Sequence, residues 1–191
     1  MKDSEDQILV SKCLNGEIDA FKEILSRYQK IIFNMNFRMV QNFDDAHEVT
    51  QAVFVKVYEN LKKYNTKYKF YSWVYRIAVN ESINFIKRNK KIQEFPEDYE
   101  SNEKNPDAQM QEVELQQTIS LSLAELNPDF RIIIVLRHFL DFSYRDISNT
   151  LGIPENTVKS RLYSARQILA ESLTKKGIHS NEWVRSIKDN K

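Results

Sequence analysis

Apolar residues recur at helical spacing along almost the whole chain, and no other feature restricts the possible folds so strongly. Phe21, Ile24 and Tyr28, for example, follow one another three or four positions apart, which places them on one face of an α-helix. Only three glycines and four prolines occur in the 191 residues, and no alternating, strand-like pattern persists. The sequence therefore predicts an all-α fold, with helices at 4–16, 17–41, 45–61, 70–91, 113–126, 128–140, 144–151 and 154–173.

One stretch breaks this periodicity. Residues 92–112 contain two prolines and no helical spacing of apolar residues, and eight acidic residues lie between positions 94 and 114 against a single lysine. A segment of this composition stays extended and solvated. We therefore expect two helical domains, 1–91 and 113–175, joined by a flexible acidic linker, with the second domain built from four helices. The tail, 176–191, is compatible with a short helix or a frayed end.

The composition argues against several classes of protein. No apolar run is long enough to span a membrane, and residues 1–20 lack the apolar core of a signal peptide. Cys13 is the only cysteine, so no internal disulfide can form, and the three histidines show no metal-ligand spacing. We expect a cytoplasmic protein with no metal, no cofactor, no small-molecule substrate and no catalytic site.

The stretch GIPENTVKSRLYSAR, 152–166, carries the signals of a tight turn followed by a basic helix. Upstream of it, Ser143 with Asp146 three positions later is typical of a helix N-cap, and Gly152 is typical of a helix end. Pro154 suits the first turn of the next helix, where its missing N–H is not needed. A short helix, a glycine turn and a second helix together are the layout of a helix-turn-helix.

The second helix of this pair has two different faces. Its apolar residues share one face: Val158, Leu162, Ala165 and Leu169. Polar and basic residues share the other face: Asn156, Lys159, Ser160, Tyr163 and Arg166. A recognition helix contacts base edges with such N-terminal polar residues and phosphates with its basic residues. A solvated hairpin within a helical bundle is the alternative, and the glycine turn together with the basic face favours DNA binding.

Aromatic and basic residues are interleaved between positions 62 and 91, where nine basic residues stand against a single acidic one. Basic side chains that follow a phosphate backbone, together with aromatic rings that stack on unpaired bases, are typical of single-stranded nucleic-acid binding. Tyr64 and Tyr68, in the expected loop, are free for this role, whereas Trp73 and Phe85 are expected in the core. An ordinary surface helix with solubilising lysines explains the block about as well.

The expected helix 45–61 carries more apolar surface than one core needs. Asp45, with Glu48 three positions later, is expected to be its N-cap. One apolar stripe consists of Ala46, Val49, Val53 and Val57. A second row consists of Phe54, Tyr58 and Leu61, with Gln51 and Val55 beside it. Surplus apolar surface indicates either a site for a protein partner or a helix that is buried on two sides, and the pattern alone favours the helix buried on two sides.

These features, in this order, resemble the small two-domain extracytoplasmic-function sigma factors of bacterial RNA polymerase. The resemblance covers nearly the whole chain, and two runs carry it most specifically: FYSWVYRIAVNESINFIKR, and LNPDFRIIIVLRHFLDFSYRDISNTLGIPENTVKSRLYSARQIL. It implies a protein that is not an enzyme. Such a protein binds core polymerase and directs promoter-specific initiation by reading the −10 and −35 promoter elements.

The resemblance also implies partners within the transcription machinery. The helix 45–61 is implied to dock on the clamp of the polymerase's largest subunit, and the second domain to contact the flap of the second-largest subunit. The expected polymerase-binding residues are Asp45, Glu48, Gln51, Phe54, Val55 and Tyr58. An anti-sigma factor, membrane-anchored for many family members, is implied to cover these surfaces. The acidic linker is implied to run toward the path of the RNA.

The same resemblance divides promoter recognition between the domains. The loop and helix at 64–88 are implied to read the −10 element and to hold a base flipped out of the non-template strand. The expected contacts there are Tyr64, Tyr68, Lys69, Phe70, Arg76, Asn80, Asn84, Lys87 and Arg88. The helix-turn-helix is implied to read the −35 element in the major groove of duplex DNA. The expected contacts there are Asn156, Lys159, Ser160, Arg161, Tyr163 and Arg166.

Two other functions stay open on the sequence. A helix-turn-helix regulator that binds duplex DNA as a dimer would leave the basic and aromatic block unexplained. A sigma-like accessory protein that binds polymerase without reading promoters would leave the recognition helix unexplained. A site-specific recombinase would need a nucleophile domain with strands and glycine-rich turns, and the three glycines argue against it.

Overall fold

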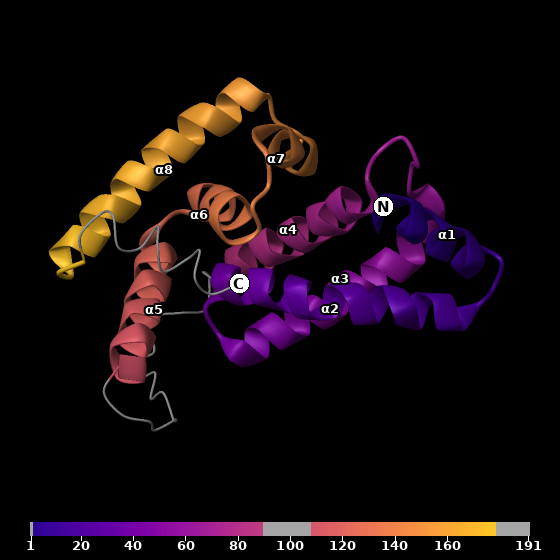
Figure 1. Ribbon diagram of the computed structural model, residues 1–191, viewed down its shortest axis with the longest axis horizontal. Coiled ribbons are helices and arrows are strands. Elements are labelled where there is room, and N and C mark those ends of the chain that lie inside the picture. The colour runs from indigo at the N-terminus through magenta and orange to yellow at the C-terminus, as the bar shows by residue number, and fades with distance from the viewer. Residues whose placement is uncertain (1, 90–107, 179–191) are drawn as a thin grey trace.

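The computed structural model describes residues 2–89 and 108–178, and every regular element within these ranges is helical (Figure 1). The elements are α1 (Lys2–Leu14), α2 (Ile18–Val40), α3 (Phe43–Asn60), the 3₁₀ turn η1 (Leu61–Lys63), α4 (Phe70–Asn89), α5 (Ala108–Glu125), α6 (Pro128–Ile134), the π-helical turn η2 (Val135–Phe139), α7 (Tyr144–Leu151) and α8 (Glu155–Lys175). The predicted all-α fold is confirmed. Helix α5 begins inside the segment expected as a linker, whose residues 92–107 lie outside the described residues, as does the tail from residue 179.

Helices α1 to α4 form one group, in which α2, α3 and α4 pack against one another (Figure 1). The apolar stripe expected on α3 is its buried face: Ala46, Val49, Val53 and Val57. Ile32 of α2 and Phe70 at the start of α4 are fully buried in the same core. The helical period of the sequence thus determines which face each helix turns inward.

A buried polar network joins these three helices. Asn36 of α2 donates from Nδ2 to Thr50 Oγ1 of α3 at 2.9 Å, and Ser82 of α4 donates from Oγ to Asn36 Oδ1 at 2.9 Å. All three side chains are buried, so each polar group needs its partner inside the protein. The network therefore favours the one helix register that satisfies its members together.

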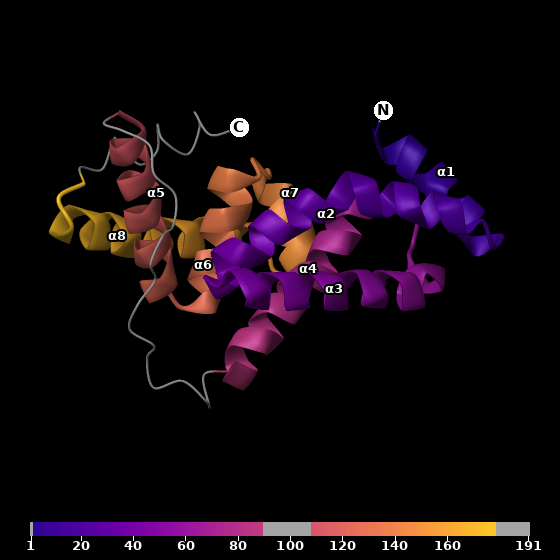
Figure 2. The ribbon, with the colours of Figure 1, turned by 90° about the horizontal axis from the view of Figure 1, so that it is seen from below.

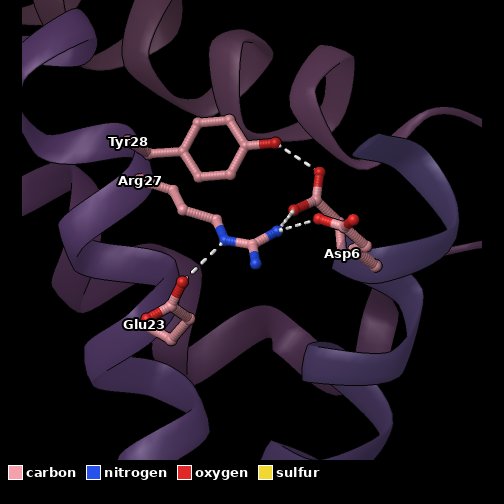
Figure 3. Close-up of polar contacts among 5 residues, drawn as sticks. Asp6, Glu23, Arg27 and Tyr28 are labelled. Carbon is pink, nitrogen blue, oxygen red and sulfur yellow. Dashed lines mark hydrogen bonds and ion pairs between the residues drawn. The ribbon is translucent and has the colours of Figure 1, made fainter. Parts of the chain in front are cut away.

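Helix α1 is held on α2 by a buried carboxylate (Figure 3). Asp6 is 2% exposed and accepts a hydrogen bond of 2.5 Å from the Tyr28 hydroxyl. Arg27 donates to Asp6 at 3.4 Å and also to Glu5 and Glu23, which lie nearer the surface. Burial, and then the bond to Asp6, raise the pKa of Tyr28 far above its ordinary value. The hydroxyl therefore remains a donor at every physiological pH.

Replacing Asp6 by alanine is expected to lower the free energy of unfolding by about 1–3 kcal/mol, because the buried Tyr28 hydroxyl loses its acceptor. Urea denaturation followed by circular dichroism measures the change. Asp19→Ala is the matched control, since Asp19 pairs with Lys22 on the surface and its loss is expected to leave the unfolding midpoint unchanged. Equal midpoints for the two variants would contradict the role assigned to Asp6.

Helices α5 to α8 form the second group, in which α8 packs against α5, α6 and α7 (Figure 1). Arg131 of α6 is buried, and its guanidinium donates to carbonyl oxygens at the end of α5: Leu123 at 2.8 Å, Ala124 at 2.5 Å and Leu126 at 3.1 Å. It also donates to Met39 O near the end of α2. Burial lowers the pKa of Arg131 to about 10. The cation stays charged at neutral pH and stabilises the negative ends of two helices, one from each group.

The two groups lie against each other (Figure 2). Helix α4 packs against α6 and α7, and α2 packs against α5, α6 and η2. Arg38 of α2 lies over the Phe139 ring of η2, with its guanidinium carbon 4.3 Å from the ring centroid. The two DNA-binding regions expected from the sequence are therefore in one compact body, with the helix-turn-helix next to α4.

Helix α3 begins two residues earlier than predicted. Its N-cap is Asn42, whose side chain accepts a hydrogen bond of 3.0 Å from the Asp45 N–H. The prediction of an N-cap at Asp45 with Glu48 as its partner is therefore wrong. Asp45 instead lies in the first turn, where its charge favours the positive end of the helix dipole. Glu48 pairs with Arg88 of α4 at 3.3 Å.

Candidate nucleic-acid and polymerase-binding surfaces

The turn between α7 and α8 forms as the sequence predicts. Ser143 is the N-cap of α7, and its Oγ accepts a hydrogen bond of 3.1 Å from the Asp146 N–H. Gly152 ends α7 with φ of 68°, a left-handed conformation that glycine adopts without strain, and its N–H donates to Ser148 O at 2.8 Å. Pro154 lies one residue before α8, which begins at Glu155, rather than within its first turn. The chain therefore turns sharply from α7 into α8.

The two faces of α8 separate as expected. The apolar row is buried: Val158, Leu162, Ala165 and Leu169. The exposed polar face at its N-terminal half consists of Asn156, Lys159, Ser160 and Tyr163. Tyr163 is 65% exposed, although it is a large aromatic residue. These side chains are exposed on the helix, and Lys159 Nζ lies over the Tyr144 ring of α7, 6.0 Å from its centroid.

The two arginines expected on this surface are half-buried. Arg166 donates from Nε to His138 Nε2 at 3.1 Å, which orients its guanidinium beside η2. Arg161 lines a cavity of about 100 Å³ between the two helical groups, and Asn80 of α4 lines the same cavity. Arg161 therefore lies beside α4 of the first group of helices.

Two residues expected to contact single-stranded DNA lie in the core instead. Phe70 is fully buried, and the Tyr64 ring packs edge-on against it with ring centroids 5.2 Å apart. The Tyr64 hydroxyl donates to Tyr68 O at 2.6 Å and so holds the loop in place. The expectation that Tyr64 is free is wrong, and neither ring is accessible to an unstacked base. Tyr68, at 58% exposure, is the open aromatic of this loop. Phe85 is buried as expected, whereas Trp73 is only half-buried.

The remaining expected residues are all exposed and fall into two sets. One set lies on the C-terminal half of α4: Asn80, Asn84, Lys87 and Arg88. The second set lies against α7 and consists of Lys69, just before α4, and Arg76. Arg76 donates from Nε to Thr150 O at 3.2 Å and from Nη2 to Asn149 O. Lys69 Nζ lies 3.8 Å from Asp146 Oδ1.

Asp146 is the centre of this contact between α4 and α7. The Tyr71 hydroxyl donates to Asp146 Oδ1 at 2.8 Å, and the Ser143 hydroxyl donates to Oδ2 at 2.6 Å. Burial acts to raise the pKa of Asp146, but these two hydrogen bonds and the charge of Lys69 outweigh it and hold the pKa below its usual range. The carboxylate is therefore ionised at neutral pH and joins the two groups of helices.

An apolar groove of about 870 Å³ lies between α2 and α3. Its α3 wall contains four of the expected polymerase-binding residues: Gln51, Phe54, Val55 and Tyr58. Val55 and Tyr58 are 57% and 54% exposed, whereas Phe54 is nearly buried. The Tyr58 ring packs edge-on against Phe21 of α2, with centroids 5.0 Å apart. Helix α3 is therefore buried on one side and open on the other.

The other two expected polymerase contacts, Asp45 and Glu48, do not line this groove. Sequence reasoning in turn missed the α2 wall, which includes Ile18, Phe21 and Leu25. Their spacing of three and four positions places them on one face of the helix, and this is the sequence signal for the wall. Ile18 is 55% exposed, so part of this row faces solvent.

Within residues 2–89 and 108–178, no helix is long and apolar enough to cross a membrane. The same part of the chain holds no group of three or more histidine, cysteine, aspartate or glutamate side chains arranged to bind a metal ion. Its prominent surface features are the exposed polar face of α8, the basic helix α4 and the apolar groove between α2 and α3. The fold defines an all-α protein whose second group of helices contains a helix-turn-helix.

Comparison with known proteins identifies the family. Residues 24–92 match the family model of sigma-70 region 2, and residues 116–169 match that of sigma-70 region 4. The chain is 31% identical over 176 residues to the ECF RNA polymerase sigma-E factor of Escherichia coli, covering 86% of this chain and 92% of that protein. It is 30% identical over 181 residues to the RNA polymerase sigma-H factor of Pseudomonas aeruginosa, covering 88% and 94%. The chain belongs to the extracytoplasmic-function sigma factors of RNA polymerase.

Solved structures share the fold. CnrH, in complex with the cytosolic domain of CnrY, superposes with a TM-score of 0.69 at 20% identity, over 89% of this chain and 97% of CnrH. The sigma factor RpoE of Bartonella quintana, in complex with the anti-sigma factor NepR, superposes with a TM-score of 0.63 at 23% identity, over 81% and 96%. Both helical groups of the present chain therefore have counterparts in sigma factor structures.

Proposed function

We propose that this sigma factor docks on core RNA polymerase through the groove between α2 and α3, reads a −35 element with α8 and reads a −10 element with α4. The catalysis belongs to the polymerase, and the chain contributes promoter selectivity without carrying out chemistry. Its site of action is the cytoplasm, where transcription takes place. The observation that carries the proposal is the exposed polar face of α8, a helix that packs against the capped helix α7.

The groove supports docking on a helical partner. An amphipathic helix binds by laying its apolar face into a groove of this kind, and Val55 and Tyr58 on α3 and Ile18 on α2 offer it exposed apolar contacts. Gln51 at the same surface can add a hydrogen bond. We assign this groove to the clamp of the largest polymerase subunit, and the second domain to the flap of the second-largest subunit.

The two DNA surfaces support a division of recognition. On α8, Asn156, Lys159 and Ser160 lie near the N-terminus of a helix that can enter the major groove. On α4, the amides of Asn80 and Asn84 can bond an unpaired base while Lys87 and Arg88 contact phosphates. Tyr68 is the exposed ring that can stack on such a base. Arg76 and Lys69 can contact phosphates beside this surface once their contacts with α7 are broken.

Binding and footprinting test the proposal together. The protein is mixed with core polymerase, the complex is isolated by gel filtration, and its protection of promoter DNA is mapped. We expect a complex of one chain per polymerase that protects two separated elements and makes the downstream one reactive to permanganate. Protection of a single duplex site by the free protein, with no polymerase complex, would favour the regulator alternative instead.

An inhibitory partner fits the same groove. Exposed apolar surface of this extent is typical of a site that a protein covers. We infer that an anti-sigma factor, anchored in the membrane or free, occupies the groove between α2 and α3 when the sigma factor is inactive. Purification of the native protein at physiological levels is expected to yield it with this partner, and recovery of the free chain alone under non-inducing conditions would contradict the inference.

A further inference from the structure

Arg166, on the expected recognition face of α8, is held by a side chain that lies outside this helix. Its Nε donates a hydrogen bond of 3.1 Å to Nε2 of His138, and both side chains are half-buried. Because an arginine Nε always carries its proton, His138 is the acceptor, and its imidazole is neutral with the proton on Nδ1. The guanidinium is planar, so a bond at Nε restricts both the position and the plane of the group.

His138 can restrain another side chain because its own segment is anchored. It lies in η2, the π-helical turn between α6 and α7 (Figure 1), and turns of this kind are frequent at functional sites. The Leu140 N–H donates to Val135 O at 3.2 Å and closes the turn. Arg137, next to His138, donates from Nη1 to Phe142 O at 2.9 Å and so ties η2 to the chain that enters α7.

A second side chain of the same face of α8 is also contacted from outside the helix. Lys159 Nζ lies 6.0 Å from the centroid of the Tyr144 ring, and the Arg137 guanidinium carbon lies 5.3 Å from the same centroid. Lys159 and Arg166 are seven positions apart, which is about two helical turns and places them on one face. The segment from η2 to the start of α7 therefore contacts two of the side chains expected to meet the −35 element.

A restrained guanidinium suits contact with a base. With Nε bonded to His138, Arg166 presents its terminal nitrogens, Nη1 and Nη2, as a fork of fixed orientation. Such a fork donates two parallel hydrogen bonds to O6 and N7 of guanine in the major groove, the commonest specific contact of arginine with DNA. Contacts with phosphates carry no sequence information and need no such orientation. A side chain that is already ordered also loses less conformational entropy when it binds.

We propose that His138 is a positioning residue for −35 recognition, which holds Arg166 so that Nη1 and Nη2 read one guanine of the element. This inference rests on the proposed function, because it assigns a role within the contact between α8 and the −35 element. Removal of the His138 acceptor leaves the charge of Arg166 on the helix. The general attraction to DNA is therefore expected to persist, while the discrimination among bases falls.

Selection of −35 sequences by the holoenzyme tests the proposal. Core polymerase is combined with each sigma variant and a promoter library in which the −35 element is randomised, and the bound promoters are sequenced. Arg166→Ala identifies the base pair in question as the position where a preference for guanine falls by about tenfold or more. His138→Ala is expected to lower the preference at that same position by about fivefold and to leave the other positions unchanged. The double variant is expected to match Arg166→Ala, since His138 acts through Arg166.

Two further variants separate the hydrogen bond from a merely structural effect. In His138→Gln, the carbonyl oxygen of the amide stands close to the place of the imidazole Nε2 and can accept the bond from Arg166. This variant is expected to select the same −35 sequences as the unaltered protein. In His138→Asn, the shorter amide is near the place of Nδ1 and does not reach Arg166, so the loss is expected to persist. Circular dichroism checks that each variant is folded.

The outcomes separate this inference from the proposed function. The positioning role would be overturned by a preference that is unchanged or uniformly weakened in His138→Ala, by equal losses in His138→Gln and His138→Asn, or by additive losses in the double variant. A guanine preference that survives Arg166→Ala would overturn it as well. In all these cases the unaltered holoenzyme would still select two promoter elements. An unaltered holoenzyme that selects no −35 sequence would instead overturn the proposed function.

Discussion

Replacing Val55 by glutamate is expected to weaken binding to core RNA polymerase by about a hundredfold or more. Val55 lies 57% exposed on the α3 wall of the apolar groove, so the substitution does not disturb the core of the domain. A partner helix seated in the groove would have to bury the new carboxylate without a counter-charge. That burial costs several kcal/mol, and each 1.4 kcal/mol corresponds to a tenfold loss of affinity.

Fluorescence anisotropy of the labelled sigma factor, titrated with core polymerase, measures this loss. Ile8→Glu is the matched control, because Ile8 is also 57% exposed and apolar but lies on α1, away from the groove. We expect the control to bind as the unaltered protein does. Unimpaired binding by Val55→Glu would show that the groove is not the docking site.

Replacing Lys159 by glutamate is expected to reduce transcription from promoters with a −35 element by at least tenfold, while polymerase binding stays unchanged. Lys159 is exposed near the start of α8, where a recognition helix meets base edges and phosphates. One lost base or phosphate contact costs about 1–3 kcal/mol, and the reversed charge adds repulsion from the DNA backbone.

The control for this variant lies on the same helix. Lys175→Glu makes the identical charge change at the far end of α8, about 24 Å along the axis from Lys159. Run-off transcripts and gel shifts of duplex −35 DNA are compared for both. Equal losses in the two variants would indicate non-specific electrostatics and contradict the assignment of a recognition surface to the start of α8.

Much of the fold is encoded locally and could be predicted from the sequence. Val49 and Val53 face the core of α3 because their spacing follows the helical period, and Ser143 and Gly152 delimit α7 through short-range hydrogen bonds. The sequence predicts the cap of α3 at Asp45, but Asn42 is an equally good capping residue. The structure selects Asn42, so that two more residues join the helix.

Residues whose role depends on tertiary contacts were harder to predict. Phe70 and Tyr64 have the composition of a stacking site, yet their neighbours in the fold place them in the core. Arg131 gives no local signal of burial, because its partners are carbonyls of α2 and α5 that come together only in the folded chain. The sequence predicts that Arg76 contacts DNA, and only the packing of α4 on α7 reveals its hydrogen bonds to carbonyl oxygens of α7.

Transcription in vitro tests the central claim most directly. Core polymerase from the organism that encodes the chain is supplied with a library of random upstream sequences, with and without the protein, and the 5′ ends of the transcripts are sequenced. We expect new, discrete start sites that appear only with the protein and share two upstream elements, and we expect Lys159→Glu to erase selection of the upstream element alone. An unchanged set of transcripts, although the protein is bound to the polymerase, would contradict its function as a promoter-reading sigma factor.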